Sequence, residues 1–223
     1  EKTKNKYISR ICFNKKKYYI AIMKYEKQNI YFIGDLHVYH KNVILYDNRP
    51  FNTLDEMHEA LINNWNNTIK KDDIIYNLGD LSFGSFEQTK EFVTQLNGKH
   101  QIIIGNHDKI KDIKKLNIYE NIYEYGTEIW IKDESVTTKK SNGYQHLILS
   151  HYPILSWNRQ HYGSIHLHAH SHQSLVNNEK TNWYYNRKVL DVGCNGTNYT
   201  PLSYTEVKEL LNNKTVPKND SHI

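Results

Sequence analysis

The order of apolar and amphipathic segments predicts an α/β fold for this chain of 223 residues. Apolar runs of strand length alternate with segments whose apolar residues recur at helical spacing. The first three runs are 29–34, 73–78 and 100–104, and each of them leads into Gly-Asp or Gly-Asn. A short apolar run that ends in Gly followed by a polar residue is typical of a buried strand entering a loop.

Capping boxes predict where the helices begin. Thr53-x-x-Glu56, Ser85-x-x-Gln88 and Ser203-x-x-Glu206 each precede apolar residues at helical spacing. In such a box the two side chains satisfy backbone N–H groups that the first turn of a helix leaves free. The second half is richer in predicted strands, namely 121–125, 128–131, 144–149, 164–167 and 184–192, with a hairpin tip at 132–143.

Charge divides the chain into an arm and a body. Residues 1–28 hold nine basic and two acidic residues, a net charge of +7, whereas the remainder is net −2. We therefore predict a basic arm at 1–28 that is not part of the core, one domain at 29–211, and a polar, disordered tail at 212–223. As an alternative boundary, the functional core begins near Met23. A basic arm can bind nucleic acid or anionic lipid, but the same charge also follows from the general richness in Asn, Lys, Ile and Tyr.

Hydropathy and cysteine content favour a cytoplasmic protein. No apolar stretch reaches the roughly 18 residues that a membrane span needs, so we expect no membrane partner. The apolar run at 18–23 is too short for the core of a secretion signal. The two cysteines, Cys12 and Cys194, form no CxxC pair and are interpreted as reduced thiols.

Metal-ligating residue types follow five of the predicted strands. They occur in Gly34-Asp35-Leu36-His37, Gly79-Asp80, Gly105-Asn106-His107-Asp108, Ser150-His151 and His168-Ala169-His170-Ser171-His172. Ligand sites in open α/β sheets gather at the carboxyl ends of strands, so these side chains are expected to meet. Imidazole and carboxylate together suit a pair of divalent transition metals. Each motif alone has a plainer interpretation, as a capped turn, a solvated histidine or a surface histidine tract.

The five motifs in this order resemble those of calcineurin-like metallophosphoesterases. The resemblance covers about 29–211 and extends to HKNV, NRPF, and the pair DVG and NYTPLS. It points to the small, single-domain bacterial and phage branch. It implies a four-layer αββα sandwich of two mixed β-sheets flanked by helices. One departure is Ala169, where the family usually has Gly; a positive φ there would cost energy. The basic arm is a second departure.

The resemblance also implies a ligand set for two divalent metal ions, with Mn foremost and Fe, Zn or Ni as alternatives. One metal would be held by Asp35, His37 and His172. The other would be held by Asn106, His151 and His170, and Asp80 would bridge both. His168, the remaining histidine of the run, is interpreted as structural.

The activity implied is hydrolysis of phosphomono- or phosphodiester bonds of a small substrate. A hydroxide bridging the two metals would attack in line, with His107 as general acid and Asp108 orienting His107. Arg49, Arg159 and His40 are candidate substrate contacts, although the two arginines are equally well interpreted as surface residues. Two alternatives remain open: a nuclease or nucleic-acid-binding member of the superfamily, and a non-catalytic scaffold. The sequence makes no prediction of an oligomeric state.

Overall fold

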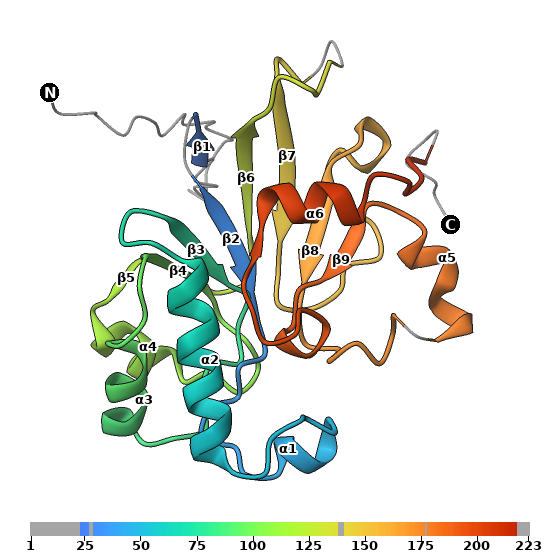
Figure 1. Cartoon of the computed structure of the whole chain (residues 1–223). Coiled ribbons are helices and arrows are strands. Elements are labelled where there is room, and N and C mark those ends of the chain that lie inside the picture. The colour runs from blue at the N-terminus through green and yellow to red at the C-terminus, as the bar shows by residue number, and fades with distance from the viewer. Residues whose placement is uncertain (1–22, 27–28, 138–140, 177, 218–223) are drawn as a thin grey trace, which may run out of the picture.

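Two five-stranded β-sheets pack face to face in the protein, with helices on their outer sides (Figure 1). The computed structural model describes residues 23–26, 29–137, 141–176 and 178–217. Sheet A has the strand order β1 (Met23–Tyr25), β6 (Thr127–Lys132), β7 (Tyr144–Leu149), β8 (Ile165–His168), β9 (Val189–Asp191). Sheet B has the order β10 (Leu202–Ser203), β2 (Ile30–Ile33), β3 (Ile74–Asn77), β4 (Lys99–Ile103), β5 (Tyr119–Tyr123). Both sheets are mixed, since β6–β7 and β10–β2 are antiparallel pairs.

Helices accompany the strands of both sheets. Sheet B carries α1 (Val43–Tyr46), α2 (Leu54–Thr68), α3 (Phe86–Val93) and α4 (Ile110–Leu116). The rest of the chain adds η1 (Gln160–Tyr162), η2 (Glu179–Thr181), α5 (Asn182–Tyr185), η3 (Cys194–Gly196) and α6 (Tyr204–Leu210). None of the helices in the described part of the chain combines the length and the apolar character that a membrane span requires.

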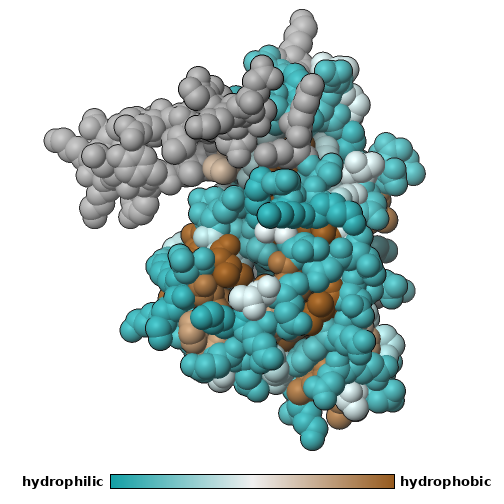
Figure 2. All heavy atoms as spheres, turned by 60° about the vertical axis from the view of Figure 1, so that its left-hand side comes forward, coloured by the Kyte–Doolittle hydropathy of each residue, from teal (hydrophilic) through white to brown (hydrophobic). Residues whose placement is uncertain are grey.

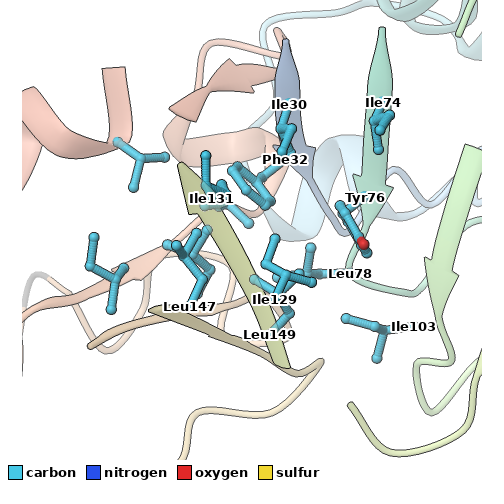
Figure 3. Packing of buried hydrophobic residues seen from close by; sticks show 14 of the residues in the cluster. Ile30, Phe32, Ile74, Tyr76, Leu78, Ile103, Ile129, Ile131, Leu147 and Leu149 are labelled. Carbon is cyan, nitrogen blue, oxygen red and sulfur yellow. The ribbon is translucent and has the colours of Figure 1, made fainter. Parts of the chain in front are cut away.

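Three apolar clusters mark the boundaries between layers. The first lies between the sheets, where Phe32 and Tyr76 of sheet B face Ile129 and Leu147 of sheet A (Figure 3). The second joins sheet B to α2, α3 and α4. The third packs Trp157, Tyr184 and Tyr185 against the outer face of sheet A. The helix–sheet–sheet–helix layering predicted from the resemblance is therefore confirmed.

Parallel pairing brings the loops of the predicted site to one edge. Strands β2, β3 and β4 run parallel, and so do β7, β8 and β9. The sheets meet there, because Gly34 after β2 forms a parallel bridge with Gly193 after β9. All five loops that carry ligand-type residues thus leave carboxyl ends of strands at this edge.

The helix caps follow the sequence prediction, with one difference. Ser85 and Ser203 form complete capping boxes with Gln88 and Glu206. At α2 the Thr53 side chain accepts from the Glu56 N–H, but the Glu56 carboxylate accepts from the N–H of Asn52, not from that of Thr53. The predicted helix start holds because either arrangement satisfies first-turn donors.

The predicted strand at 184–192 is wrong in its first half. Residues Asn182–Tyr185 are helical, and only Val189–Asp191 is a strand. Tyr184 and Tyr185 have the aromatic character typical of strands, but here both rings are buried in the third cluster. Strand propensity depends on packing partners, and tertiary packing overrides it in this segment.

The described structure extends beyond both ends of the predicted domain, residues 29–211. Strand β1 pairs in parallel with β6, and Tyr25 is buried, with its hydroxyl 2.6 Å from that of Tyr76. After α6, the Thr215 N–H donates to the Asn186 carbonyl at 2.7 Å. The remainder of the predicted arm (1–22 and 27–28) and of the predicted tail (218–223) lies outside the described residues.

The hypothesis that the core begins near Met23 predicts that removal of residues 1–22 leaves the unfolding midpoint unchanged. Removal of residues 1–25 should lower the free energy of unfolding by about 3 kcal/mol or more, since it takes away a buried aromatic ring and the partner of β6. Urea denaturation of the full chain and both truncations measures the difference. An equal loss in the two truncations would contradict the boundary at Met23.

Candidate metal centre

The predicted ligand side chains form two neighbouring groups. Asp35, His37 and His172 make the first. Asp80, His151 and His170 make the second. Within each group the candidate ligand atoms all lie within 4.8 Å of one another. The first group joins residues that are far apart in the sequence, His37 and His172, whose Nε2 atoms are 3.0 Å apart.

Asp80, a member of the second group, also lies next to the first group. Its Oδ2 atom is 3.6 Å from His37 Nε2 and 3.6 Å from His151 Nε2. The remaining predicted ligand, Asn106, places its Oδ1 atom 2.9 Å from His151 Nε2. One carboxylate oxygen of Asp80 therefore lies between a histidine nitrogen of the first group and one of the second, which is the position that a bridging ligand requires.

The backbone of these loops is strained where the ligands leave it. Positive φ angles of 46–67° occur at five of the seven predicted ligands: Asp35, His37, Asp80, His170 and His172. Non-glycine residues adopt this region rarely, and strain of this kind concentrates at functional sites. Backbone hydrogen bonds between loops hold it, since the Asp35 N–H donates to Gly79 O and the His37 N–H to Asp80 O, both at 3.0 Å.

The first group has the chemistry of a cation site. Asp35 is fully buried, and its Oδ2 atom lacks a hydrogen-bond partner among the described residues. Burial raises the pKa of the Asp35 carboxyl to about 8, with the nearby carboxyl groups of Asp191 and Asp80 adding to the effect. Burial also lowers the pKa of His37 to about 2, so its imidazole is neutral and offers a lone pair. A divalent cation would stabilise the ionised carboxylate and accept that lone pair.

The second group is oriented by a carbonyl. His151 Nδ1 is 2.8 Å from the Leu78 carbonyl oxygen, which can only accept, so Nδ1 carries the proton. Burial lowers the pKa of His151. In the neutral ring Nε2 is therefore the atom with a lone pair, and this atom faces Asp80 and Asn106. A backbone acceptor of this kind is the usual outer partner of a metal-binding histidine.

Asp47 is a site residue that the sequence did not single out. Its Oδ2 atom lies 2.6 Å from His172 Nδ1. Burial opposes a charge on His172, but the bond to Asp47 and the charge of Asp35 outweigh burial and raise the pKa of the ring. The contact leaves Nε2 of His172 facing His37. Asp47 lies two residues before Arg49 in the segment that contains NRPF, which was the available signal.

Arg49 is turned into the protein, whereas the sequence suggested a substrate contact or a surface residue. Its side chain is buried and donates to the carbonyls of Leu36 and Asp35, both at 2.9 Å, and to Asp47 at 3.3 Å. A guanidinium has several donors in a fixed fork, and here it uses them to hold the strained loop after β2. Arg49 therefore stabilises the loop that carries the predicted ligands Asp35 and His37.

Asp108 also has another role than expected. Its carboxylate accepts three backbone N–H groups, those of Gly105, Asp80 and Leu81, each at 2.9 Å. Both oxygens are thus engaged in tying the loop after β4 to the loop after β3. Burial raises the pKa of Asp108 despite these bonds. The carboxylate holds the backbone of Asp80, and no hydrogen bond joins it to the His107 ring among the described residues.

His107 and His40 lie beside the first group. The backbone N–H of His107 donates to Asp80 Oδ1 at 2.9 Å, and its exposed ring lies 5.8 Å from the His37 ring. The His40 ring lies 5.8 Å from that of His37 and stacks on Phe83 at 4.1 Å. Phe83 also contacts the His107 ring at 4.7 Å. The structure brings both histidines to the mouth of the site.

Arg159 lies elsewhere. Its guanidinium stands over the rings of Trp130 at 5.0 Å and Tyr162 at 5.3 Å. These residues line a cavity whose wall includes no predicted metal ligand. The structure therefore does not bring Arg159 to the candidate centre. The sequence suggested Arg159 as a substrate contact only because it lies in the loop after His151. In the structure that loop leads through η1 toward the other end of the sheet.

Ala169, the departure from the family motif, fits without strain. Ala169 is not among the described residues that have a positive φ angle. Its side chain is fully buried, and a Cβ built on Gly34 would lie 2.6 Å from the Ala169 Cβ. Gly34 thus leaves the space that Ala169 fills. The neighbouring His168 is buried and bonded through Nδ1 to Ala169 O and through Nε2 to the Tyr185 hydroxyl, as a structural histidine would be.

A cavity of about 390 Å³ opens beside His107. It lies between α3 and α4, and its wall includes Phe83, Phe86, Asn106, Lys109 and Leu116. The side of the molecule at the left of Figure 1 is turned forward in Figure 2, where hydrophobic residues surround a hollow in a largely hydrophilic surface. The candidate centre therefore has a partly apolar pocket adjoining it.

Comparison with known proteins identifies relatives of similar size. The family model described as calcineurin-like phosphoesterase matches residues 28–186. The uncharacterized protein MJ1445 of Methanocaldococcus jannaschii is 33% identical over 186 residues, which cover 82% of this chain and 92% of that protein. The Gene 66 protein of Mycobacterium phage D29 is 26% identical over 204 residues, covering 82% of this chain and 96% of that protein. The predicted resemblance, including the phage branch, is confirmed.

A solved structure shares the fold. The crystal structure of the protein of unknown function AQ665 from Aquifex aeolicus superimposes with a TM-score of 0.61 at 22% identity. The match covers 82% of this chain and all of that chain. At this identity the likeness concerns the fold alone.

Exchange of the Gly34–Ala169 contact tests the packing under the site. Gly34→Ala should lower the free energy of unfolding by about 1–3 kcal/mol through overpacking. Ala169→Gly in the same chain should restore most of that loss, because it removes the opposing methyl group. Urea unfolding of the two single variants and the double variant measures the coupling. Additive effects of the two changes would contradict the proposed contact.

Asp47→Ala should weaken metal binding by about 10–100-fold, the usual effect of removing an outer partner of a ligand histidine. Metal affinity is measured by calorimetric titration of the metal-free protein with Mn²⁺. Asp72→Ala is the matched control, since Asp72 lies on an exposed turn before β3. Equal affinities of the Asp47 variant and the control would show that His172 needs no such support.

Proposed function

The chain belongs to the calcineurin-like phosphoesterase family, and from its candidate centre we propose that it hydrolyses phosphoesters with two divalent metal ions. One observation carries the proposal: Asp80 Oδ2 stands 3.6 Å from a histidine of each ligand group. A shared carboxylate is what a pair of closely spaced cations needs. The cations, when bound, would supply Lewis acidity and a water of lowered pKa at the phosphorus.

The donor set supports transition metals over Mg²⁺ or Ca²⁺. Four imidazoles and one amide accompany the two carboxylates, and imidazole suits Mn, Fe, Zn and Ni better than it suits the hard cations. We propose Mn²⁺ first, with the other three as alternatives. The residues that would hold one ion are Asp35, His37 and His172, and those that would hold the other are Asn106, His151 and His170.

His107 is the proposed general acid. Its backbone is anchored to Asp80, while its ring is exposed at the mouth of the site. It lines the adjoining cavity, so a proton donated from this ring would reach an oxygen whose substituent occupies that cavity. Asp108 and Arg49 support this arrangement by holding the loops, and neither takes part in proton transfer.

The adjoining cavity supports an ester with a sizeable organic leaving group. Its partly apolar wall, with Phe83 and Phe86, can cover a ring or an alkyl group, while Lys109 and Asp112 place charges of opposite sign on the same wall. A phosphodiester has such a group on each side of the phosphorus, whereas many monoesters need less room. Tyr152, half exposed and 4.5 Å from the His170 ring, borders the opposite side. We therefore propose a small phosphodiester as the preferred substrate.

His107→Ala should retain both metals and lose about 10²–10⁴-fold in kcat, the usual contribution of a general acid. Asp80→Asn should lose metal from both groups together, because the same oxygen serves both. The assay is hydrolysis of bis-p-nitrophenyl phosphate and p-nitrophenyl phosphate with added Mn²⁺. Bound metal is measured in parallel by plasma mass spectrometry.

Asp72→Asn makes the same chemical change as Asp80→Asn at an exposed turn and should match the unaltered protein in both readouts. Loss of metal in the His107 variant would place that ring among the ligands and refute its proposed role. Absence of hydrolysis of either ester by the metal-loaded protein would favour a non-catalytic scaffold.

A further inference from the structure

The loop after β8 carries one predicted ligand of each metal ion. His170 belongs to the second group and His172 to the first, and Ser171 stands between them in the sequence. The φ angles of His170 and His172 are 67° and 46°, and that of the next residue, Gln173, is 67°. Non-glycine residues keep such a conformation only when surrounding contacts hold it. The loop therefore needs an anchor that keeps the two imidazoles in place.

A buried carboxylate, that of Asp191 at the end of β9, lies beside this loop, because β9 pairs in parallel with β8. The Ser171 hydroxyl donates to Asp191 Oδ2 at 2.5 Å, and the Gln173 N–H donates to the same oxygen at 3.1 Å. These two donors come from the residues on either side of His172. Asp191 is only 2% exposed, so a carboxylate that lost these donors would remain buried without them, at a cost in free energy. The loop is therefore fastened to β9 at the position of its ligands.

The other oxygen of Asp191 holds the backbone beside the ligand Asp35. Asp191 Oδ1 accepts from the Gly193 N–H at 2.8 Å. A Cβ built on Gly193 would lie 2.5 Å from Asp35 Oδ2, the oxygen that lacks a hydrogen-bond partner among the described residues, and 3.0 Å from Asp191 Oδ1. Gly193 therefore lies between the two carboxylates and leaves no room for a side chain. Asp191 itself is in neither ligand group, yet its contacts reach the surroundings of ligands of both.

We propose that Asp191 is a positioning residue for both metal ions and that it acts through the Ser171 hydroxyl. The inference rests on the proposed two-metal function, because it concerns the ligands of that centre. Asp47 has a narrower role, since its contact reaches His172 alone among the ligands. Loss of Asp47 should therefore affect the ion of the first group, whereas loss of Asp191 should affect both ions.

The test is calorimetric titration of the metal-free full chain with Mn²⁺, which measures an affinity for each of the two ions. Asp191→Asn keeps the shape of the side chain but removes the charge and one acceptor oxygen, and it should weaken the binding of both ions by about 10–100-fold. Ser171→Ala should weaken both by an amount at the lower end of this range. The double variant should lose no more affinity than Asp191→Asn alone, because the two residues share one interaction.

Ser164→Ala is the matched control, because Ser164 is also buried and directly precedes β8, at the end opposite to Ser171. Its hydroxyl donates to the Asn158 carbonyl at 2.6 Å. Urea unfolding of the metal-free variants measures the structural cost of losing each hydroxyl. Ser164→Ala should lower the stability and leave both Mn²⁺ affinities unchanged, whereas Ser171→Ala should change the affinities as well.

Three results would overturn the positioning role while leaving the two-metal function intact. They are Mn²⁺ affinities of Asp191→Asn or Ser171→Ala equal to those of Ser164→Ala, weakening of a single ion, and additive losses in the double variant. Absence of Mn²⁺ binding by the unaltered chain would instead overturn the two-metal function, and the positioning role with it.

Discussion

The site depends on the burial of carboxylates at a place where five loops meet. Asp80 is almost fully buried, and each of its polar neighbours comes from another loop: His37 from the loop after β2, His151 from the loop after β7, and the His107 N–H from the loop after β4. A buried carboxylate without water must find donors or a cation. That requirement orders the loops around Asp80, and the oxygen that no N–H satisfies is the one that faces both histidine groups.

The same requirement explains the residues beside the site that are not proposed to bind a metal or to react. The loop after β4 approaches Asp80 so closely that a Cβ on Gly105 would lie 2.2 Å from Asp80 Oδ1. Asp108 then joins the two loops through the backbone N–H groups of Asp80 and Leu81. Arg49 supports the loop after β2 in a comparable way, through two of its carbonyls. Charged residues beside a metal centre thus need not touch a metal or a substrate, because strained loops also need donors and acceptors.

The two ends of sheet A offer different chemistry. At the carboxyl ends of β7 and β8 the loops present the imidazoles of His151, His170 and His172 to the buried carboxylates of sheet B, a setting for cations. At the amino ends of the same strands lies a cavity lined by Arg159, Lys188 and Lys208, which includes none of the candidate metal ligands. Because β7, β8 and β9 run parallel, the length of the strands separates these two ends.

Local patterns in the sequence determined most of the strands, the starts of α2, α3 and α6, and the residue types at the strand ends. Alternating apolar runs and capping boxes are short-range features, and the resemblance of the five ordered motifs supplied the layering and the ligand groups. Tertiary structure alone decided which charged residue serves which partner. Asp47 meets His172 across 125 positions, and Arg49 turns inward to the loop after β2. It also decided that Ala169 needs no positive φ, because Gly34, distant in sequence, leaves space for its methyl group. Such contacts arise only when the two sheets pack, since no local pattern records which distant residue will lie opposite.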